Sequence, residues 1–345
     1  MNSNMEITAK LETVMNSLVL DLTELKVRSC LIAYQNTLLM EHYRESQLKQ
    51  EIAKINSCTK SIVSALVCIA MDKDLLPPPE TPISSFFPQL QHDPDPLKRE
   101  ITIKHLLTMS AGFRWQEFKG INSFPNMIKT ANWLDYTLSQ PLAHAPGTYM
   151  EYNSGCSQLL SSLISQAAGC TTAEFAEQYL FGPLGIDNYE WEYDPQGLHT
   201  GGFGLKLKPE DMLKFGQLFL NLGEWQGKQL ISADKVKRAT TPFIDTNAPR
   251  RGQYGWHWWV DSYVPEADKV VDRVNNTGGN SVHSGENQRT TSMTLDYYYA
   301  LGFGGQNIFV IPSLDLVVVI TRDQTKRGKP PVDIFRQYIA PRISI

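Results

Sequence analysis

Strand-like sequence patterns lie at the two ends of this chain, whereas helical patterns fill its middle. The segments rich in β-branched and aromatic residues are residues 27–34, 37–43, 254–260, 307–311 and 316–321. The first two meet at Gln35-Asn36, which predicts a hairpin, and the last two are linked by residues 312–315. We therefore predict an α+β fold in which an antiparallel sheet is assembled from both ends of the sequence.

The middle of the chain predicts a mainly helical insertion. After the helix breaker Pro77-Pro78-Pro79, helical periodicity recurs at residues 103–109, 126–138, 157–168, 173–180 and 209–222. The predicted parts are a sheet domain of residues 1–75 and 246–345, terminal helices at 5–25 and 332–339 that flank it, and a helical domain of residues 76–245. Clefts between two such units commonly hold substrate, so we expect the active site there.

Residues 265–296 are polar and rich in Asn, Ser, Thr and Gly. They predict a long flexible loop just before the last strands. Two interpretations remain: a lid over the site, or a disordered loop without function, and the second is favoured.

Composition limits the classes of partner. The formal charge is −4 and the chain contains no run of Lys and Arg, which argues against nucleic acid. Residues 1–10 are polar and no long apolar segment follows, so we expect no membrane span and a cytoplasmic location. Five cysteines without metal-type spacing predict reduced, buried thiols. No metal or cofactor is expected, and no oligomeric state is indicated.

Ser57 and Lys60 form the first chemical motif, at the start of the apolar run of residues 62–71. We predict a buried helix with Asn56 as its N-cap, which places positions i and i+3 on one face. A desolvated, neutral lysine can activate a serine hydroxyl. The motif alone is weak: Ser46/Lys49 and Ser232/Lys235 have the same spacing, and a serine beside a surface lysine is the simpler interpretation.

Tyr152 and Ser154 form the second motif, on a short extended segment after the turn at residues 145–148. A phenol near a lysine can be held partly ionised and shuttle protons, and Ser154 could donate a hydrogen bond to Lys60 or to the leaving group. The alternatives are a packed aromatic ring for Tyr152 and a helix N-cap for Ser154.

The third motif is the glycine-rich segment of residues 302–306, which enters a strand. Gly305 and Gln306 could approach a ligand closely, and an amide there could complete an oxyanion hole with that of Ser57. An ordinary glycine-rich turn is the alternative. Trp256 and Trp258 are predicted on one face of a strand, where Trp258 could line an acyl pocket, although core packing is favoured.

Together these residues resemble the serine β-lactamase and penicillin-binding protein superfamily, with residues 101–108 and 181–186 as further points of similarity. Over residues 27–339 the chain is most similar to the class C-like branch, which includes esterases, D-amino-acid peptidases and 6-aminohexanoate-dimer hydrolases. The resemblance implies a β-lactamase-like fold, acylation of Ser57, Lys60 as base and Tyr152 as proton shuttle. It also implies an oxyanion hole made by the amides of Ser57 and Gln306.

Two departures bear on the substrate. The second motif of the family usually ends in asparagine, whereas here it ends in Ser154, a variant similar to that of the aminohexanoate hydrolases. Phe303-Gly304-Gly305 offers no cation for a substrate carboxylate. Carboxylate-bearing antibiotics are therefore disfavoured. The leading hypothesis is a serine hydrolase acting on a small ester or amide. The alternatives are a catalytically impaired binding or sensor protein, and a D,D-peptidase or weak β-lactamase.

Overall fold

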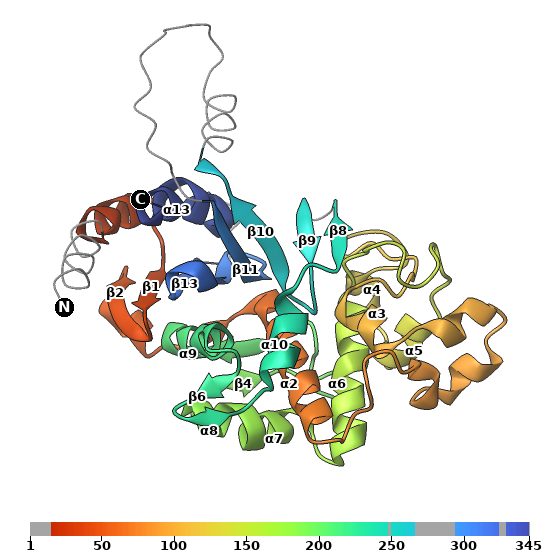
Figure 1. Cartoon of the computed structure of the whole chain (residues 1–345). Coiled ribbons are helices and arrows are strands. Elements are labelled where there is room, and N and C mark those ends of the chain that lie inside the picture. Colours follow the sequence, from red (N-terminus) through yellow and green to blue (C-terminus); the bar gives the residue numbers. More distant parts are fainter. Residues whose placement is uncertain (1–14, 248–249, 266–293, 324–328, 345) are drawn as a thin grey trace, which may run out of the picture.

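The computed structural model describes residues 15–247, 250–265, 294–323 and 329–344. Their main feature is an eight-stranded sheet with the strand order β2-β1-β13-β12-β11-β10-β9-β8, in which every pair is antiparallel (Figure 1). The strands are β1 (Ser29–Tyr34), β2 (Thr37–Tyr43), β8 (Ile244–Thr246), β9 (Gly252–Tyr254), β10 (Trp259–Tyr263), β11 (Leu295–Gly302), β12 (Gln306–Ile311) and β13 (Leu316–Thr321). Because β1 pairs with β13, the predicted assembly of the sheet from both ends of the sequence is confirmed.

The two faces of the sheet are covered by different helices. On one face, α9 (Pro209–Leu220) lies so close that a Cβ on Gly216 would come within 2.5 Å of Val317. On the other face, Phe335 near the C-terminus stacks on Phe309 of β12, with ring centroids 4.4 Å apart. The helix of residues 15–24 and the C-terminal helix α13 (Ala340–Ile343) lie side by side (Figure 1), joined by an ion pair of Asp21 and Arg342. The sheet is therefore buried on both faces, as its apolar β13 requires.

The predicted hairpin at Gln35-Asn36 and the predicted link between the last two strands are confirmed. β1 and β2 are joined by Gln35 and Asn36, both with positive φ, as a two-residue hairpin turn of type I′ requires. β12 and β13 are joined through the short 3-10 helix η7 (Pro312–Leu314).

Two predictions about the strands were wrong. Residues 254–260 are not one strand, because residues 255–258 form the turn between β9 and β10. His257 in this turn has a φ of 58°, and Trp256 and Trp258 lie in the turn and not on one face of a strand. Strand β11 was missed: Leu295 and Asp296, placed at the end of the polar loop, already belong to it. The rest of that loop, residues 266–293, lies outside the described residues, as does the start of the predicted N-terminal helix.

The helical part of the chain surrounds α2 (Thr59–Asp72) and α6 (Ser154–Ala168), which pack against each other. The other α-helices are α3 (Ile103–Leu107), α4 (Phe124–Met127), α5 (Trp133–Leu138), α7 (Thr172–Ala176), α8 (Gly182–Leu184), α10 (Ala233–Thr240) and α12 (Pro331–Ile334). Short 3-10 helices are η1 (Ser46–Lys49), η2 (Asn56–Cys58), η3 (Ile83–Ser85), η4 (Pro88–His92) and η5 (Pro96–Glu100), and η6 (Glu177–Phe181) and η8 (Phe335–Ile339) are π-helical. Two small sheets contain β3 (Ala53–Lys54), β4 (Glu190–Trp191) and β5 (Leu205–Leu207), and β6 (Glu224–Trp225) with β7 (Lys228–Gln229).

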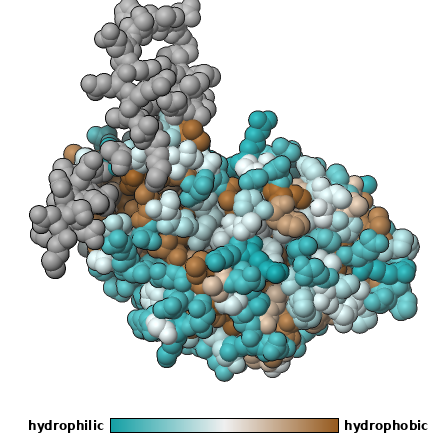
Figure 2. Space-filling view, in the orientation of Figure 1, coloured by the Kyte–Doolittle hydropathy of each residue, from teal (hydrophilic) through white to brown (hydrophobic). Residues whose placement is uncertain are grey.

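The predicted domain boundaries stay a prediction. Helix α9, within residues 76–245, packs on the central sheet, and β8, which crosses the boundary at residue 245, forms the last strand of that sheet. The molecular face in Figure 2 is mainly hydrophilic with scattered apolar residues. None of the helices in the described ranges is both long and apolar enough to cross a membrane.

Candidate active site

Ser57 lies in η2, immediately before the buried helix α2. The predicted N-cap role of Asn56 is wrong: η2 and α2 have no side-chain cap, and Asn56 is left-handed with φ 49°. Its side chain instead donates a hydrogen bond of 2.5 Å to the carbonyl of Phe303, in the turn between β11 and β12. Asn56 therefore fixes the segment that carries Ser57 to the end of the central sheet.

Lys60 is 1% exposed and points back at Ser57. Its Nζ lies 3.1 Å from Ser57 Oγ, 2.9 Å from Ser154 Oγ and 2.8 Å from the carbonyl oxygen of Gly202. Burial lowers the pKa of Lys60 to about 8, and the nearby charge of Glu117 opposes that shift. A neutral lysine is therefore accessible at a mildly alkaline pH, as a general base requires.

Tyr152 lies against both residues of the first motif. Lys60 Nζ is 4.9 Å from the centre of its ring, and Ser57 hydrogen-bonds the phenol. On the other side the ring stacks on Trp259, with centroids 5.9 Å apart. Burial, followed by the charge of Glu117, raises the pKa of Tyr152 above its usual value, which disfavours the partly ionised phenol expected from the sequence. A phenol that keeps its proton can act as a proton donor.

Ser154 is the first residue of α6, but it is not the cap. Asn153 is the N-cap, and its side chain accepts hydrogen bonds from the amides of Gly155 and Cys156. Ser154 Oγ accepts from Lys60 and donates to Glu117, so the expected donation to Lys60 is reversed. Because Asn153 caps the helix, the Ser154 hydroxyl can bond to Lys60 and Glu117 in the site.

Glu117 and Gly202 are contacts of the site that the sequence did not reveal. Glu117 accepts from both the amide and the hydroxyl of Ser154 and from Trp115 Nε1. It lies in an irregular stretch between helices, where no periodicity predicts which side chain points inward. Gly202 allows its own carbonyl to reach Lys60, since a Cβ there would lie 3.1 Å from the Cβ of Ser154 and 3.2 Å from Lys60 Nζ.

The third motif forms the turn between β11 and β12, directly beside Ser57. A Cβ on Gly302 would lie 2.3 Å from the carbonyl oxygen of Ile55, so only glycine permits this approach of the sheet to η2. Gly305 has a φ of 102°, which also favours glycine. The carbonyl oxygen of Gln306 accepts a hydrogen bond of 3.2 Å from Cys58 Sγ, and the side chain of Gln306 donates to the carbonyl of Arg322. The backbone of Gln306, not its side chain, is thus next to the nucleophile segment.

Trp258 does not line the site. It is 0% exposed and packs between Phe215 and Phe219 of α9 and Tyr298 of β11. The prediction that Trp258 contacts substrate is therefore corrected to core packing, while its neighbour Trp259 supports Tyr152.

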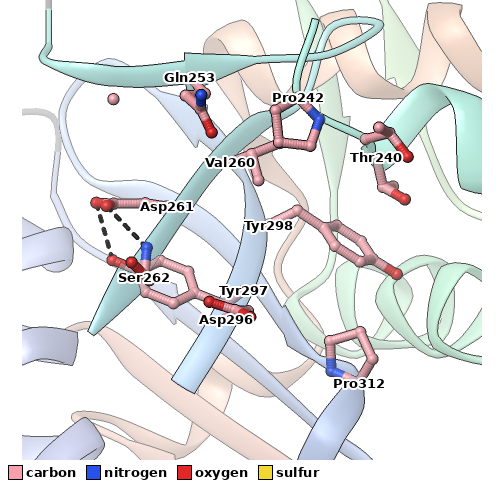
Figure 3. A pocket seen from close by; sticks show the side chains of 12 residues that line it. Thr240, Pro242, Gln253, Val260, Asp261, Ser262, Asp296, Tyr297, Tyr298 and Pro312 are labelled. Atoms are coloured by element: carbon pink, nitrogen blue, oxygen red, sulfur yellow. Dashed lines mark hydrogen bonds between the residues drawn. The ribbon is translucent and has the colours of Figure 1, made fainter. Parts of the chain in front are cut away.

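A cavity of about 420 Å³ opens elsewhere on the sheet, around β9, β10 and β11 (Figure 3). Asp261, Ser262 and Tyr297 line it, and its lining includes none of Ser57, Lys60 and Tyr152. Asp261 is already bound by Tyr297 and by Arg336. This cavity is therefore separate from the candidate active site.

Comparison with known proteins identifies the family of this chain. The model of the family described as Beta-lactamase matches residues 42–338, most of the chain. The chain belongs to the β-lactamase family. Within that family of serine hydrolases, the β-lactamase-like fold and the resemblance inferred from the sequence are both confirmed.

Similar solved structures span different activities in this family. EstCE1, described as a hydrolase with promiscuous acyltransferase activity, shares 14% identity at a TM-score of 0.70, over 98% of this chain and 100% of that one. A Bacillus anthracis protein assigned as a 6-aminohexanoate-dimer hydrolase shares 18% identity at a TM-score of 0.69, covering 90% of this chain and 77% of that one. A class C β-lactamase from Rhodobacter sphaeroides shares 15% identity at a TM-score of 0.60, covering 92% of this chain and 95% of that one. No curated protein sequence matches. At these identities the likeness shows the fold.

Proposed function

We propose that this chain is a serine hydrolase that cleaves a small ester or amide through an acyl-enzyme on Ser57. The observation that carries the proposal is the position of Lys60, which is buried and 3.1 Å from the Ser57 hydroxyl. A lysine whose pKa is lowered to about 8 by burial has the protonation behaviour of a general base.

The first step in this mechanism is acylation. Neutral Lys60 takes the proton of Ser57 as Oγ attacks the carbonyl carbon, and the oxyanion is held by the amides of Ser57 and Gln306. As the carbonyl re-forms, Tyr152 donates its proton to the leaving alcohol or amine, and the proton on Lys60 makes up for the one the phenol has lost. Water then attacks the ester with the same groups acting in reverse, releasing the acid and restoring Ser57.

The surroundings of Ser57 favour a substrate without a carboxylate. Phe303, whose carbonyl accepts the hydrogen bond from Asn56, is 53% exposed. Its ring centre lies 6.3 Å from that of Phe118, which is 61% exposed. Glu117 adds a negative charge next to Ser154. An apolar or neutral acyl group fits this entrance better than an anionic one. EstCE1, described as a hydrolase with promiscuous acyltransferase activity, is a similar structure whose description is compatible with acyl transfer of this kind.

Intact mass spectrometry after incubation with p-nitrophenyl acetate or a fluorophosphonate tests the proposal. We expect an adduct on the parent and none on Ser57→Ala, with slow or no labelling of Lys60→Ala. Lys49→Ala is the matched control, because Ser46 and Lys49 have the same spacing on a surface 3-10 helix. Labelling of Ser57→Ala equal to the parent would overturn the proposal, and an adduct without release of further p-nitrophenol would support the binding or sensor alternative.

A further inference from the structure

Glu117 controls the hydrogen of the Ser154 hydroxyl. Its Oε2 accepts from Ser154 N at 3.0 Å and from Trp115 Nε1 at 2.7 Å, and its Oε1 accepts from Ser154 Oγ. An ionised carboxylate has no hydrogen to donate, so the Ser154 hydroxyl must direct its own hydrogen at Glu117. Toward Lys60, Ser154 can then only accept.

The hydrogen bonds of neutral Lys60 follow from this restriction. A neutral amine has two hydrogens and one lone pair, and the three neighbours of Nζ are Ser57 Oγ, Ser154 Oγ and the Gly202 carbonyl. A carbonyl only accepts, and Ser154 only accepts because its hydrogen is held by Glu117. Both hydrogens of the amine are therefore occupied, and the lone pair faces Ser57.

We propose that Glu117 is a positioning residue which, through Ser154, aims the lone pair of Lys60 at the Ser57 hydroxyl. Glu117 touches neither the substrate nor the reacting atoms, and it acts by fixing which partner donates at each bond of the chain Glu117–Ser154–Lys60–Ser57. This inference rests on the proposed function, in which Lys60 is the base.

Replacing Glu117 by Gln reverses the direction of the hydrogen bonds from residue 117 through Ser154 to Lys60. The Gln carbonyl would keep the two N–H donors now on Oε2, from Ser154 and Trp115, and its amide group would then face Ser154 Oγ as a donor. The hydrogen of Ser154 would have to turn to Lys60 and occupy the lone pair. Size and shape barely change, so the fold should be retained.

The test measures kcat/KM for p-nitrophenyl acetate as a function of pH in the parent and in Glu117→Gln. We expect the plateau to fall on the order of 100-fold, the range of a general-base contribution. The midpoint of the acid side should move to lower pH, because the charge of Glu117 raises the pKa of Lys60. A role limited to stability would lower the amount of active protein without moving this midpoint, and circular dichroism checks that the variant is folded.

Two further variants separate polarity from charge. Ser154→Ala removes the hydroxyl that transmits the effect, so adding Glu117→Gln to it should change kcat/KM by less than about 5-fold. Glu151 is a second carboxylate near Glu117: burial, and then the charge of Glu117, raises the pKa of Glu151 to about 7. Glu151→Gln removes this carboxylate but leaves the hydrogen bonds of Ser154 intact. It should stay within about 3-fold of the parent. Equal losses for Glu117→Gln with and without Ser154 would overturn the proposal.

A neutron structure of the parent and of Glu117→Gln gives a readout independent of activity. We expect the deuterium on Ser154 Oγ to point at Glu117 in the parent and at Lys60 in the variant. Deuterium pointing at Lys60 in the parent would overturn the inference even if Ser57 is acylated. Conversely, a parent that is never acylated on Ser57 overturns the proposed function, while the neutron result still decides the orientation.

Discussion

At the scale of single residues, burial distinguishes lysines with identical local motifs. Lys49 is 44% exposed at its side chain and bonded to Glu41, which raises its pKa. Lys60 is 1% exposed, and its hydrogen-bond acceptors among the described residues, Ser57, Ser154 and Gly202, are all neutral, so desolvation lowers its pKa to about 8. The same spacing of serine and lysine thus gives a surface cation in one case and a candidate base in the other.

The pH dependence of acylation follows from this difference. Only neutral Lys60 can accept the proton of Ser57, and its neutral fraction rises as the pH rises through about 8. We expect kcat/KM for a neutral ester to increase tenfold per pH unit below about 8 and to level off above it. Rates from pH about 6 to 10, corrected with Ser57→Ala for background hydrolysis, check this. Activity that declines over that interval would contradict Lys60 as base.

At the scale of elements, the site depends on how η2 meets the turn between β11 and β12. Asn56 has a left-handed backbone and a side-chain bond to Phe303, and Gly302 admits the Ile55 carbonyl. The nucleophile segment is therefore held by the sheet, whereas Lys60 is held mainly from α6 and the Gly202 loop.

Two substitutions separate the side-chain hydrogen bond of Asn56 from its left-handed backbone conformation. Asn56→Gly keeps the left-handed backbone but loses the bond to Phe303, which we expect to cost about 1 kcal/mol of unfolding free energy. Asn56→Ala loses the same bond and adds about 1 kcal/mol of backbone strain. Urea denaturation measures both, and fluorophosphonate labelling of Ser57 should slow in both. A glycine variant as stable and as reactive as the parent would show that the tether is unimportant.

At the scale of the whole molecule, the sequence predicted what depends on patterns and missed what depends on assembly. The hairpin at Gln35-Asn36 and the buried α2 follow from local signals and were confirmed. Strand β11 carries aromatic strand formers, but it follows a long polar segment that obscured its start. The inward direction of Glu117 has no local signal, because it is set by Trp115 and Ser154, the latter distant in sequence.

The thiols test the packing of the whole chain. Cys30, Cys58, Cys68 and Cys156 are free and buried, and burial raises the pKa of each, whereas Cys170 is partly exposed. We expect Ellman's reagent to titrate a single thiol rapidly in the native protein and all five in guanidinium chloride. Cys170→Ser should abolish the fast phase. Rapid reaction of any thiol in that variant would contradict the burial of the other four.

The pairing of β1 with β13 also sets an order in time. Ser29 and Thr321, which bond across these strands, are 292 positions apart, so a nascent chain carries Ser57 and Lys60 long before the strands beside them are synthesised. Until β11, β12 and β13 leave the ribosome, Asn56 has no partner and the Gln306 amide is missing. Under the proposed mechanism, an unfinished chain therefore holds a nucleophile and a base without the completed oxyanion hole, and hydrolytic capacity arises only when the two ends of the polypeptide meet.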